Sequence, residues 1–421
     1  MVNEISLVSL GNTNVQFIDG DRGKNYPQKT DFYKDGYCVF LNTGNVKPDG
    51  FDFSDLYYIT QEKDEILNKG RVQLNDIVLT TRGTVGNVAI FDDQVPFKKI
   101  RINSGMVIIR CSNRFYPYFL YSFFRSSLFK SQCGLNGSGS AQPQLPISAI
   151  KNIKIPEFNL KTQQSIAAVL SALDKKIALN KQINTRLEQM AKTLYDYWFV
   201  QFDFPDANGK PYKSSGGEMV FDETLKREIP KGWEVKSLWK VAKYFNGLAL
   251  QKYRPENEFD DFLPVIKIRE MNEGVSLNTE RAKTNIPKEA IIDDGDILFS
   301  WSATLEIKIW SQGKGALNQH IFKVTSSEYP KYFFYFELLN YLKHFKMIAD
   351  LRKTTMGHIT QDHLKQAYIC IPSQLLLEKM ERIVTPIFQK MLITQKQNHQ
   401  LTQLRDFLLP MLMNGQVSVA E

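Results

Sequence analysis

The sequence contains few of the residues that cross-link a chain or anchor it in a membrane. Its 421 residues include only four cysteines, Cys38, Cys111, Cys133 and Cys370, and no two of them form a CxxC pair. This usage predicts buried free thiols and a cytoplasmic location. No run approaches 18 apolar residues, so we expect no membrane span. The N-terminal string MVNEISLVSL lacks the basic and apolar regions of a signal peptide.

Motifs for nucleotide and cofactor chemistry are also missing. No Gly-rich loop ends in GK[ST], and the nearest string, GDRGKN at Gly20, has the wrong spacing for a phosphate loop. The chain contains neither an NPPY-like tetrapeptide nor an FxGxG-type loop, the strings that amino-methyltransferases carry. We therefore expect this chain to bind neither S-adenosylmethionine nor a metal.

The composition is that of a folded, mildly basic protein. Hydrophobic residues make up 43% and aromatic residues 12% of the chain, enough to build sizeable cores. Lys and Arg outnumber Asp and Glu by 53 to 45, and the pI is near 9.0. This excess indicates a polyanionic partner, most often nucleic acid. No long Lys/Arg block is present, so a basic tail is not the binding element.

One pattern occurs twice in the chain. The run NDIVLTTRGTVGNVAIF returns as GDILFSWSATLEIKIW, which matches Asp76 to Asp296 and Thr84 to Thr304. Further on, RINSGMVIIR corresponds to ALNQHIFKVT, and NIKIPEF corresponds to YICIPSQ. The period is about half the chain, whereas solenoid repeats run to roughly 20–50 residues. A whole recognition module is therefore duplicated, and two such modules at a fixed separation are suited to reading two sites at once.

Each module has the pattern of a mixed α+β fold, with short β-rich runs, turn clusters and one aromatic helix. The segment 201–231 is rich in Gly, Pro, Ser and Lys and lacks periodicity, which is typical of a linker. The predicted order is a first module over 1–156, a helix over 157–200, the linker, a second module over 232–372 and a helix over 373–415.

The two helical segments carry hydrophobic seams of heptad type. The first helix, with Thr162 as N-cap, would be about 58 Å long at about 1.5 Å per residue. Pro386 and Pro410 should kink or interrupt the second. A two-fold related arrangement would run the helices antiparallel, with the modules at opposite ends of a helical rod; alternatively, the first helix lies on a globular core. The seam residues include Leu173, Ile177, Asn180, Asn184, Leu187, Leu194, Met391, Asn398, Leu401 and Leu408.

Several strings together resemble the specificity subunit of Type I restriction-modification enzymes, over essentially the whole chain. They are SIAAVLSALDKKIALNKQINTRLEQMAKTLYDYWF, the link FDFP…GKPYKSSGGEMV…EIPKGWE, and ALNQHIFKV and HITQDHLKQAYICIP in the second module. The first module departs from this pattern, because its RINSGMVII keeps only the Asn and the apolar alternation of ALNQHIFKV.

The resemblance implies a non-catalytic subunit with two target-recognition domains, each reading one half of an asymmetric bipartite sequence in double-stranded DNA. It implies that the helices set the spacer and, with their seam residues, dock two methyltransferase subunits. Those subunits would transfer methyl groups from S-adenosylmethionine to adenine N6. Endonuclease and translocase subunits, which use ATP and Mg²⁺, would join them.

Candidate DNA contacts follow from the residue types that read base edges and phosphates. In the first module the loop 80–84 offers such residues beside glycines, and Arg82 is the strongest candidate; in the second module the corresponding turn is 300–304. Asn318, Gln319 and His320 are also of interest, although their regularity indicates support for the loop. The candidates are Thr81, Arg82, Thr84, Lys98, Lys99, Arg101, Ser138, Gln142, Lys267, Arg269, Ser302, Thr304, Gln319, Arg352 and Lys353.

Two functions from other classes compete with DNA reading by a subunit. Asp296 with Glu306 and Lys308 has the form of a D…ExK site, in which carboxylates and a lysine hold Mg²⁺ and activate water in a self-sufficient nuclease. The repeat does not preserve this set, which favours a strand with alternating charges. The other alternative is a structural coiled-coil adaptor, for which no DNA binding is expected.

Overall fold

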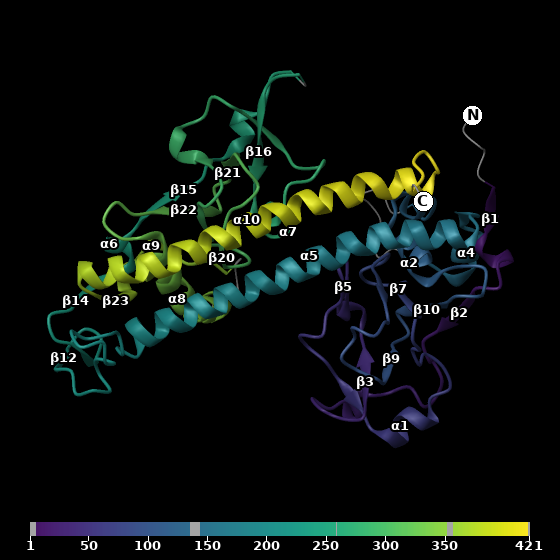
Figure 1. The fold of residues 1–421 in the computed structure, drawn as a ribbon, viewed down its shortest axis with the longest axis horizontal. Coiled ribbons are helices and arrows are strands. Elements are labelled where there is room, and N and C mark those ends of the chain that lie inside the picture. Colours follow the sequence, from purple (N-terminus) through teal and green to yellow (C-terminus); the bar gives the residue numbers. More distant parts are fainter. Residues whose placement is uncertain (1–5, 135–143, 258, 352–356, 420–421) are drawn as a thin grey trace. The chain divides into compact units, whose positions relative to one another are not determined.

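The computed structural model describes residues 6–134, 144–257, 259–351 and 357–419. The chain divides into two compact units: unit 1 is Met1–Ile177 with Leu401–Glu421, and unit 2 is Ala178–Gln400. Two long helices, α5 (Leu160–Tyr195) and α10 (Gln374–Met413), each contribute to both units (Figure 1).

Unit 1 is built on a four-stranded antiparallel sheet of order β2-β10-β7-β8. A second sheet of order β6-β3-β9 pairs β3 with β9 in parallel, and β1 pairs with β11 and β4 with β5. The strands are β1 (Leu7–Ser9), β2 (Gln16–Asp19), β3 (Cys38–Leu41), β4 (Val46–Lys47), β5 (Gly50–Phe51), β6 (Tyr58–Ile59), β7 (Ile77–Thr80), β8 (Val88–Ile90), β9 (Ile100–Ile102), β10 (Met106–Arg110) and β11 (Lys154–Pro156). The short helices are α1 (Gln61–Ile66), α2 (Pro117–Arg125), α3 (Ser127–Gln132) and α4 (Ile147–Asn152).

Unit 2 repeats this topology. Its main sheet has the order β15-β22-β19-β20, and its second sheet, β17-β16-β21-β18, again contains one parallel pair, β16 with β21. The strands are β12 (Met219–Asp222), β13 (Arg227–Pro230), β14 (Glu234–Ser237), β15 (Lys243–Asn246), β16 (Phe262–Ile266), β17 (Arg281–Lys283), β18 (Ile291–Ile292), β19 (Ile297–Ser300), β20 (Glu306–Ile309), β21 (Gly315–Leu317), β22 (Ile321–Thr325) and β23 (Tyr368–Ile371). The helices are α6 (Leu238–Val241), α7 (Ile268–Glu273), α8 (Lys331–Leu351) and α9 (Gln361–Gln366). The predicted duplication of a mixed α/β module is confirmed.

The two long helices run antiparallel within each unit. In unit 1, Arg405 of α10 forms an ion pair of 3.0 Å with Asp174 of α5. In unit 2, the Asn184 side-chain amide donates to the Met391 carbonyl at 3.3 Å. Ascending numbers on α5 therefore meet descending numbers on α10, and the predicted pair of antiparallel helices is confirmed.

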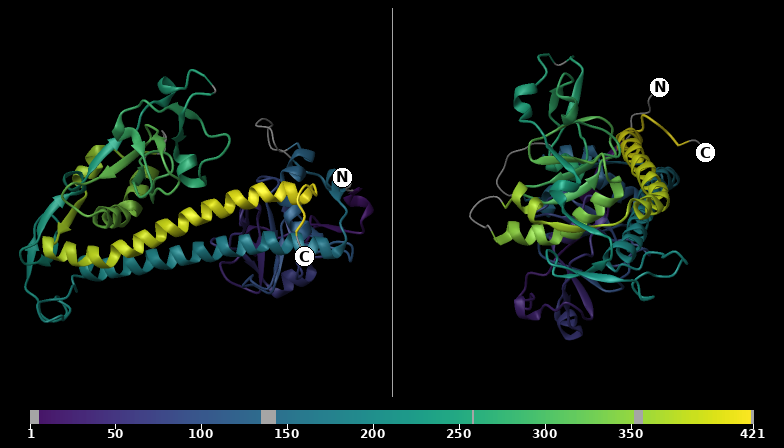
Figure 2. Two further views of the ribbon diagram at one scale, coloured as in Figure 1. Left: turned by 45° about the horizontal axis from the view of Figure 1, so that its top comes forward. Right: turned by 90° about the vertical axis from the view of Figure 1, so that its left-hand side faces the viewer.

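The ends and the prolines of these helices differ from expectation. The side chain of Asn159, not of Thr162, caps α5 by accepting from the Thr162 amide at 2.8 Å. Helix α10 includes both Pro386 and Pro410, so neither proline interrupts it. Figure 2 draws α10 as one continuous helix. Each proline removes one amide donor, and the helix tolerates the loss because its apolar side chains remain packed in the cores.

The segment 201–231 is folded rather than extended. It contains the hairpin β12–β13, and its Phe204 ring stacks on Tyr212 at 4.6 Å and on Trp233 at 5.4 Å. The composition of this segment indicated turns, whereas the aromatic contacts that order it join residues far apart in sequence.

Aromatic residues form the cores, as expected for stripes of helical spacing. Phe119, Phe123 and Phe124 of α2 are fully buried in unit 1, and Phe333 and Phe336 of α8 are fully buried in unit 2. The four cysteines are free thiols; Cys38 and Cys370 are buried, whereas Cys111 and Cys133 are only half-buried. No helix in the described ranges has both the length and the apolar character needed to cross a membrane.

Candidate functional site

The loops after β7 and β19 have the same hydrogen-bonded frame. In unit 1 the Thr80 hydroxyl donates to the Thr84 carbonyl and accepts from the Asn87 amide at 3.0 Å. In unit 2 the Ser300 hydroxyl donates to the Thr304 carbonyl at 2.6 Å and accepts from the Glu306 amide at 2.8 Å. A hydroxyl on the last residue of the strand therefore closes each five-residue loop.

A turn that begins with an asparagine, Asn103 after β9 and Asn318 after β21, supports each loop. The Asn103 amide donates to the Leu41 carbonyl at 3.1 Å, and the Asn318 amide donates to the Ile266 carbonyl at the same distance. A glycine lies against each asparagine: a Cβ atom on Gly20 would be 2.2 Å from the Asn103 carbonyl oxygen, and one on Gly247 would be 2.2 Å from that of Asn318. Only glycine permits this approach, so both turns require it.

The fourth residue of each loop has a left-handed backbone. This residue is Gly83 in unit 1, with a φ of 70°, and Ala303 in unit 2, with a φ of 56°. Alanine is strained in this region because its Cβ approaches the carbonyl oxygen. That unit 2 retains the conformation without glycine shows that the surrounding frame dictates it.

The loop of unit 1 presents Arg82 and Thr84 to solvent. The Thr84 hydroxyl donates to the Thr43 carbonyl at 3.1 Å. Thr81 is buried, and its hydroxyl donates to the Gly105 carbonyl at 3.0 Å. Of these three candidates, Arg82 has the freest side chain, and it lines a cavity of about 240 Å³.

The loop of unit 2 carries a cluster of rings. The Trp301 indole donates to Asn246 Oδ1 at 3.0 Å, and its ring centroid lies 5.8 Å from that of His320. The buried Ser302 hydroxyl lies 3.2 Å from His320 Nδ1, and Gln319 Nε2 lies 3.5 Å from His320 Nε2. Ser302 and Gln319 are thus gathered around an exposed histidine, and Thr304 is exposed at the end of the loop.

The basic cluster predicted near residue 100 divides into surface and core. Lys98 and Lys99 are exposed, and Lys99 Nζ lies 3.4 Å above the Tyr37 ring. Arg101 is only 3% exposed, and its guanidinium pairs with Asp64. The expected DNA contact is therefore wrong for Arg101, because all three residues of β9 are buried and Asp64 holds its guanidinium in the core, whereas Lys98 and Lys99 precede the strand.

The remaining basic candidates are engaged or lie elsewhere. Lys267 follows β16 and pairs with Glu280 at 2.5 Å. Arg269 belongs to α7 and pairs with the buried Glu270 at 2.5 Å. The side chains of Lys267 and Arg269 are partly exposed, and their contact with DNA stays a prediction. Four candidates lie outside the described residues: Ser138, Gln142, Arg352 and Lys353.

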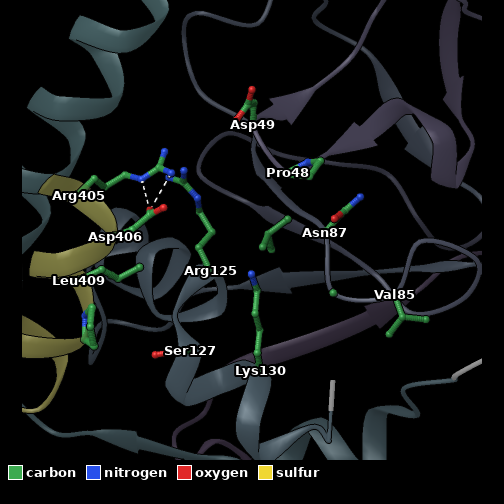
Figure 3. A pocket seen from close by; sticks show the side chains of 13 residues that line it. Pro48, Asp49, Val85, Asn87, Arg125, Ser127, Lys130, Arg405, Asp406 and Leu409 are labelled. Carbon is green, nitrogen blue, oxygen red and sulfur yellow. Dashed lines mark hydrogen bonds and ion pairs between the residues drawn. The ribbon is translucent and has the colours of Figure 1, made fainter. Parts of the chain in front are cut away.

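Unit 1 also contains a larger cavity, of about 540 Å³ (Figure 3). Arg125, Lys130 and Arg405 contribute cationic groups to its lining, and Asn87 lies on the opposite wall. Arg125 and Arg405 both pair with Asp174, at 2.5 and 3.0 Å. No local pattern in the sequence marks this triad, because its members are 49 and 231 residues apart. Arg405 also pairs with Asp406 at 2.8 Å, so two carboxylates offset the two guanidinium groups, and these ion pairs connect α2, α5 and α10 within unit 1.

The predicted docking residues lie mostly on the inner faces of the helices. Asn180 is 2% and Met391 3% exposed, and the Asn180 side-chain nitrogen has no hydrogen-bond partner in the described part of the chain. The others are buried or half-buried: Leu173, Ile177, Asn184, Leu187, Leu194, Asn398, Leu401 and Leu408. Asn184 and Met391 join α5 to α10 through their hydrogen bond, and the docking role of the ten residues stays a prediction.

The nuclease constellation does not assemble. Asp296 precedes β19 and pairs with Lys323 at 2.8 Å, whereas Glu306 lies opposite Ser300 at the far end of the β19–β20 hairpin. Four residues of strand separate them, roughly 13 Å at about 3.3 Å per residue. Lys308 pairs with Glu306 at 3.2 Å. Two carboxylates so far apart cannot share one metal ion, so this alternative is not supported.

A duplicated α/β module with polar loop tips, joined to a pair of antiparallel helices, defines a class of proteins in which one chain carries two similar candidate binding units. The family model described as Type I restriction modification DNA specificity domain matches residues 15–189 and again 230–403. The chain belongs to this family: it is a non-catalytic specificity subunit that recognises DNA within a Type I restriction-modification system.

Relatives agree along most of the chain. The sequence is 29% identical to the MjaIX specificity subunit of Methanocaldococcus jannaschii, over 82% of this chain and 78% of that one. It is 25% identical to the HindI specificity subunit of Haemophilus influenzae, over 94% and 98% of the two chains. The crystal structure of an S subunit from M. genitalium has the same fold, with a TM-score of 0.51 and 16% identity over 98% of this chain and 97% of that one.

Proposed function

We propose that unit 1 reads one half and unit 2 the other half of an asymmetric, bipartite DNA target. The observation that carries this proposal is the shared loop frame, which holds different side chains in the two units. Because the two units share this hydrogen-bonded frame, they should present their loops to DNA in the same way. The different side chains on the loops should then select different bases. The pI near 9.0 favours the phosphate attraction that sequence-independent binding requires.

The two long helices act as the spacer and as the docking surface for two methyltransferase subunits. Their seam is occupied by pairing, yet large apolar side chains remain exposed on them: Leu179 and Met190 on α5 are 49% and 55% exposed, and Ile383 and Ile393 on α10 are 44% and 52% exposed. Such side chains on a helical surface favour helix packing by a partner.

The chemistry would belong to the partners. The methyltransferase subunits would bind S-adenosylmethionine and methylate adenine N6, and endonuclease or translocase subunits would bring ATP and Mg²⁺. In this assembly, which we place in the cytoplasm, the chain contributes sequence choice and geometry.

The first test is to co-express the chain with its methyltransferase and to map N6-methyladenine in the host genome by single-molecule sequencing. We expect a split, asymmetric motif that disappears when this chain is omitted. Methylation without a motif, or none despite an active methyltransferase, would contradict the proposal and indicate an adaptor.

The spacer role has its own test. Removing residues 180–186 from α5 together with 391–397 from α10 shortens both helices by about 10 Å, or about three base pairs of DNA. We expect the preferred spacer to shorten correspondingly, or binding to be lost. Removal from one helix alone is the control, because it should break the pairing. An unchanged spacer in the double deletion would refute the ruler.

A further inference from the structure

Six equivalent positions in each unit lie in the recognition loop or directly beside it. The backbone register and hydrogen bonds make them equivalent: β2 pairs with β10 as β15 pairs with β22, and the Leu145 and Ile359 amides donate to residues 81 and 301 at 3.0 Å in both units. In unit 1 the six are Asp19, Thr81, Arg82, Ser104, Gly105 and Gln144, and in unit 2 they are Asn246, Trp301, Ser302, Gln319, His320 and His358.

The residues that hold the frame and the six that surround it behave differently. The frame keeps its chemistry between the units: a hydroxyl at 80 and 300, asparagine at 103 and 318, glycine at 20 and 247. All six surrounding positions differ in residue type, and one of them changes from arginine to serine. A scaffold that retains its supports and varies one contiguous group of side chains is organised to present that group.

In unit 1 the group borders an open cavity. Asp19, Thr81, Arg82 and Gln144 line the cavity of about 240 Å³. Arg22 lies beside them and contacts Asp19 at 3.0 Å and the Ser104 carbonyl at 3.2 Å. Carboxylate and guanidinium groups at one cavity mouth can accept from cytosine N4 and donate to guanine O6 and N7.

In unit 2 rings occupy the corresponding place. Trp301 donates its indole N–H to Asn246 Oδ1 at 3.0 Å, and its ring lies 5.8 Å from His320 and 6.4 Å from His358. The Ser302 hydroxyl joins this group through His320 Nδ1 at 3.2 Å. Rings with amide and imidazole edges can stack on a base and bond its edge.

We propose that these six equivalent positions form the specificity-determining patch of each unit, and that Asp19 and Asn246 are the members that face the same base position in their respective half-sites. This inference rests on the proposed bipartite reading and adds to it the residues that make the two halves differ. It assigns Asn246, Trp301, His320 and His358 to half-site reading, together with Asp19 and Gln144.

The sharpest variants are the reciprocal, nearly isosteric changes Asp19→Asn and Asn246→Asp. Asn246→Asp retains the oxygen that accepts the Trp301 indole, replaces the amide donor by an acceptor and adds one negative charge, the same change in net charge as in the control variant below. Lys314→Gln is the matched control, because it removes an exposed charge near the β20–β21 turn, at the other end of the hairpin. The measurement is the N6-methyladenine motif written by each variant complex.

We expect Asn246→Asp to change the preferred base in one half-site only and Asp19→Asn to do so in the other half-site only. A wrong base costs about 1–3 kcal/mol, so the preference between two bases should change by a factor of between about 5 and about 150. The complex with Lys314→Gln should methylate the same motif as the parent complex. Unchanged base preference in both patch variants, or equal changes in both halves, would overturn the inference.

If a variant complex produces no methylation, its affinity is measured for DNA duplexes that carry single-base changes. A changed order of affinities within one half-site supports the patch, and the same order as for the parent complex overturns it. A parent complex that writes no two-part motif contradicts the bipartite function itself, whereas a two-part motif insensitive to the patch contradicts only this inference.

Discussion

Replacing Arg101 should destabilise unit 1 rather than merely weaken DNA binding. The Arg101 guanidinium pairs with Asp64 and also donates to three carbonyls, those of Lys69 and Asp64 at 2.6 Å and that of Leu67 at 2.9 Å. Asp64 is 1% exposed, and its other partner is Arg71. Arg101→Met would leave this buried carboxylate and the carbonyls without their main donor. Loss of one member of a buried pair costs about 3–5 kcal/mol of unfolding free energy.

The tryptophans make the assay selective. All five lie in unit 2: Trp198, Trp233, Trp239, Trp301 and Trp310. Urea unfolding followed by tryptophan fluorescence therefore reports unit 2, whereas far-ultraviolet circular dichroism reports both units. Arg101→Met should shift the part of the dichroism transition that fluorescence does not follow. Peptide-resolved hydrogen exchange should localise the loss to β3 and β9.

Two further variants complete the comparison. Lys98→Met removes an exposed charge of the same cluster and should change stability by no more than about 0.5 kcal/mol. The double variant Arg101→Met with Asp64→Leu should recover part of the loss, since no unpaired charge remains buried. If Arg101→Met behaved like Lys98→Met in stability and lowered only DNA affinity, the structural role of Arg101 would be refuted.

Three other predictions concern unit 2, whose unfolding the same fluorescence assay follows. Ala303→Gly should raise the unfolding free energy of unit 2 by about 1 kcal/mol, because it relieves the strain of the left-handed backbone. The reciprocal change Gly83→Ala should lower the unfolding free energy of unit 1, measured by dichroism; a loss of stability with Ala303→Gly or a gain with Gly83→Ala would contradict the shared frame. Burial raises the pKa of Glu337 to about 7 from 4.5, so the contribution of Glu337 to stability should be fully present below pH ~4.5 and be lost, by about 3 kcal/mol, as the pH rises through 7. Glu337→Gln, which still accepts from the Tyr195 hydroxyl, should abolish this slope. Asn180→Leu should stabilise unit 2 by about 1–3 kcal/mol, because it removes a buried amide nitrogen without a partner in the described residues; a loss would show that the amide is satisfied.

The sequence by itself determined the duplicated module, the two heptad helices and the aromatic cores. These features are local periodicities or repeated strings, and a residue's neighbours in sequence suffice to express them. The same holds for the two loops: the matched strings at 75–91 and 295–310 placed Arg82 and Ser302 at equivalent turns, and the structure brings both to a common frame.

Only the tertiary structure decided which charges face solvent and which side chains meet at the loops. Arg101 is buried because Asp64, 37 residues away, lies beneath it, and nothing in the string KKIRI distinguishes it from Lys98 and Lys99. Asn246 meets Trp301 because β15 and β19 flank the same strand, β22, although 55 residues separate the two side chains. Burial and pairing depend on partners that are distant in the chain. The sequence therefore determines the loop frame of each unit, whereas the tertiary structure determines which side chains gather around that frame.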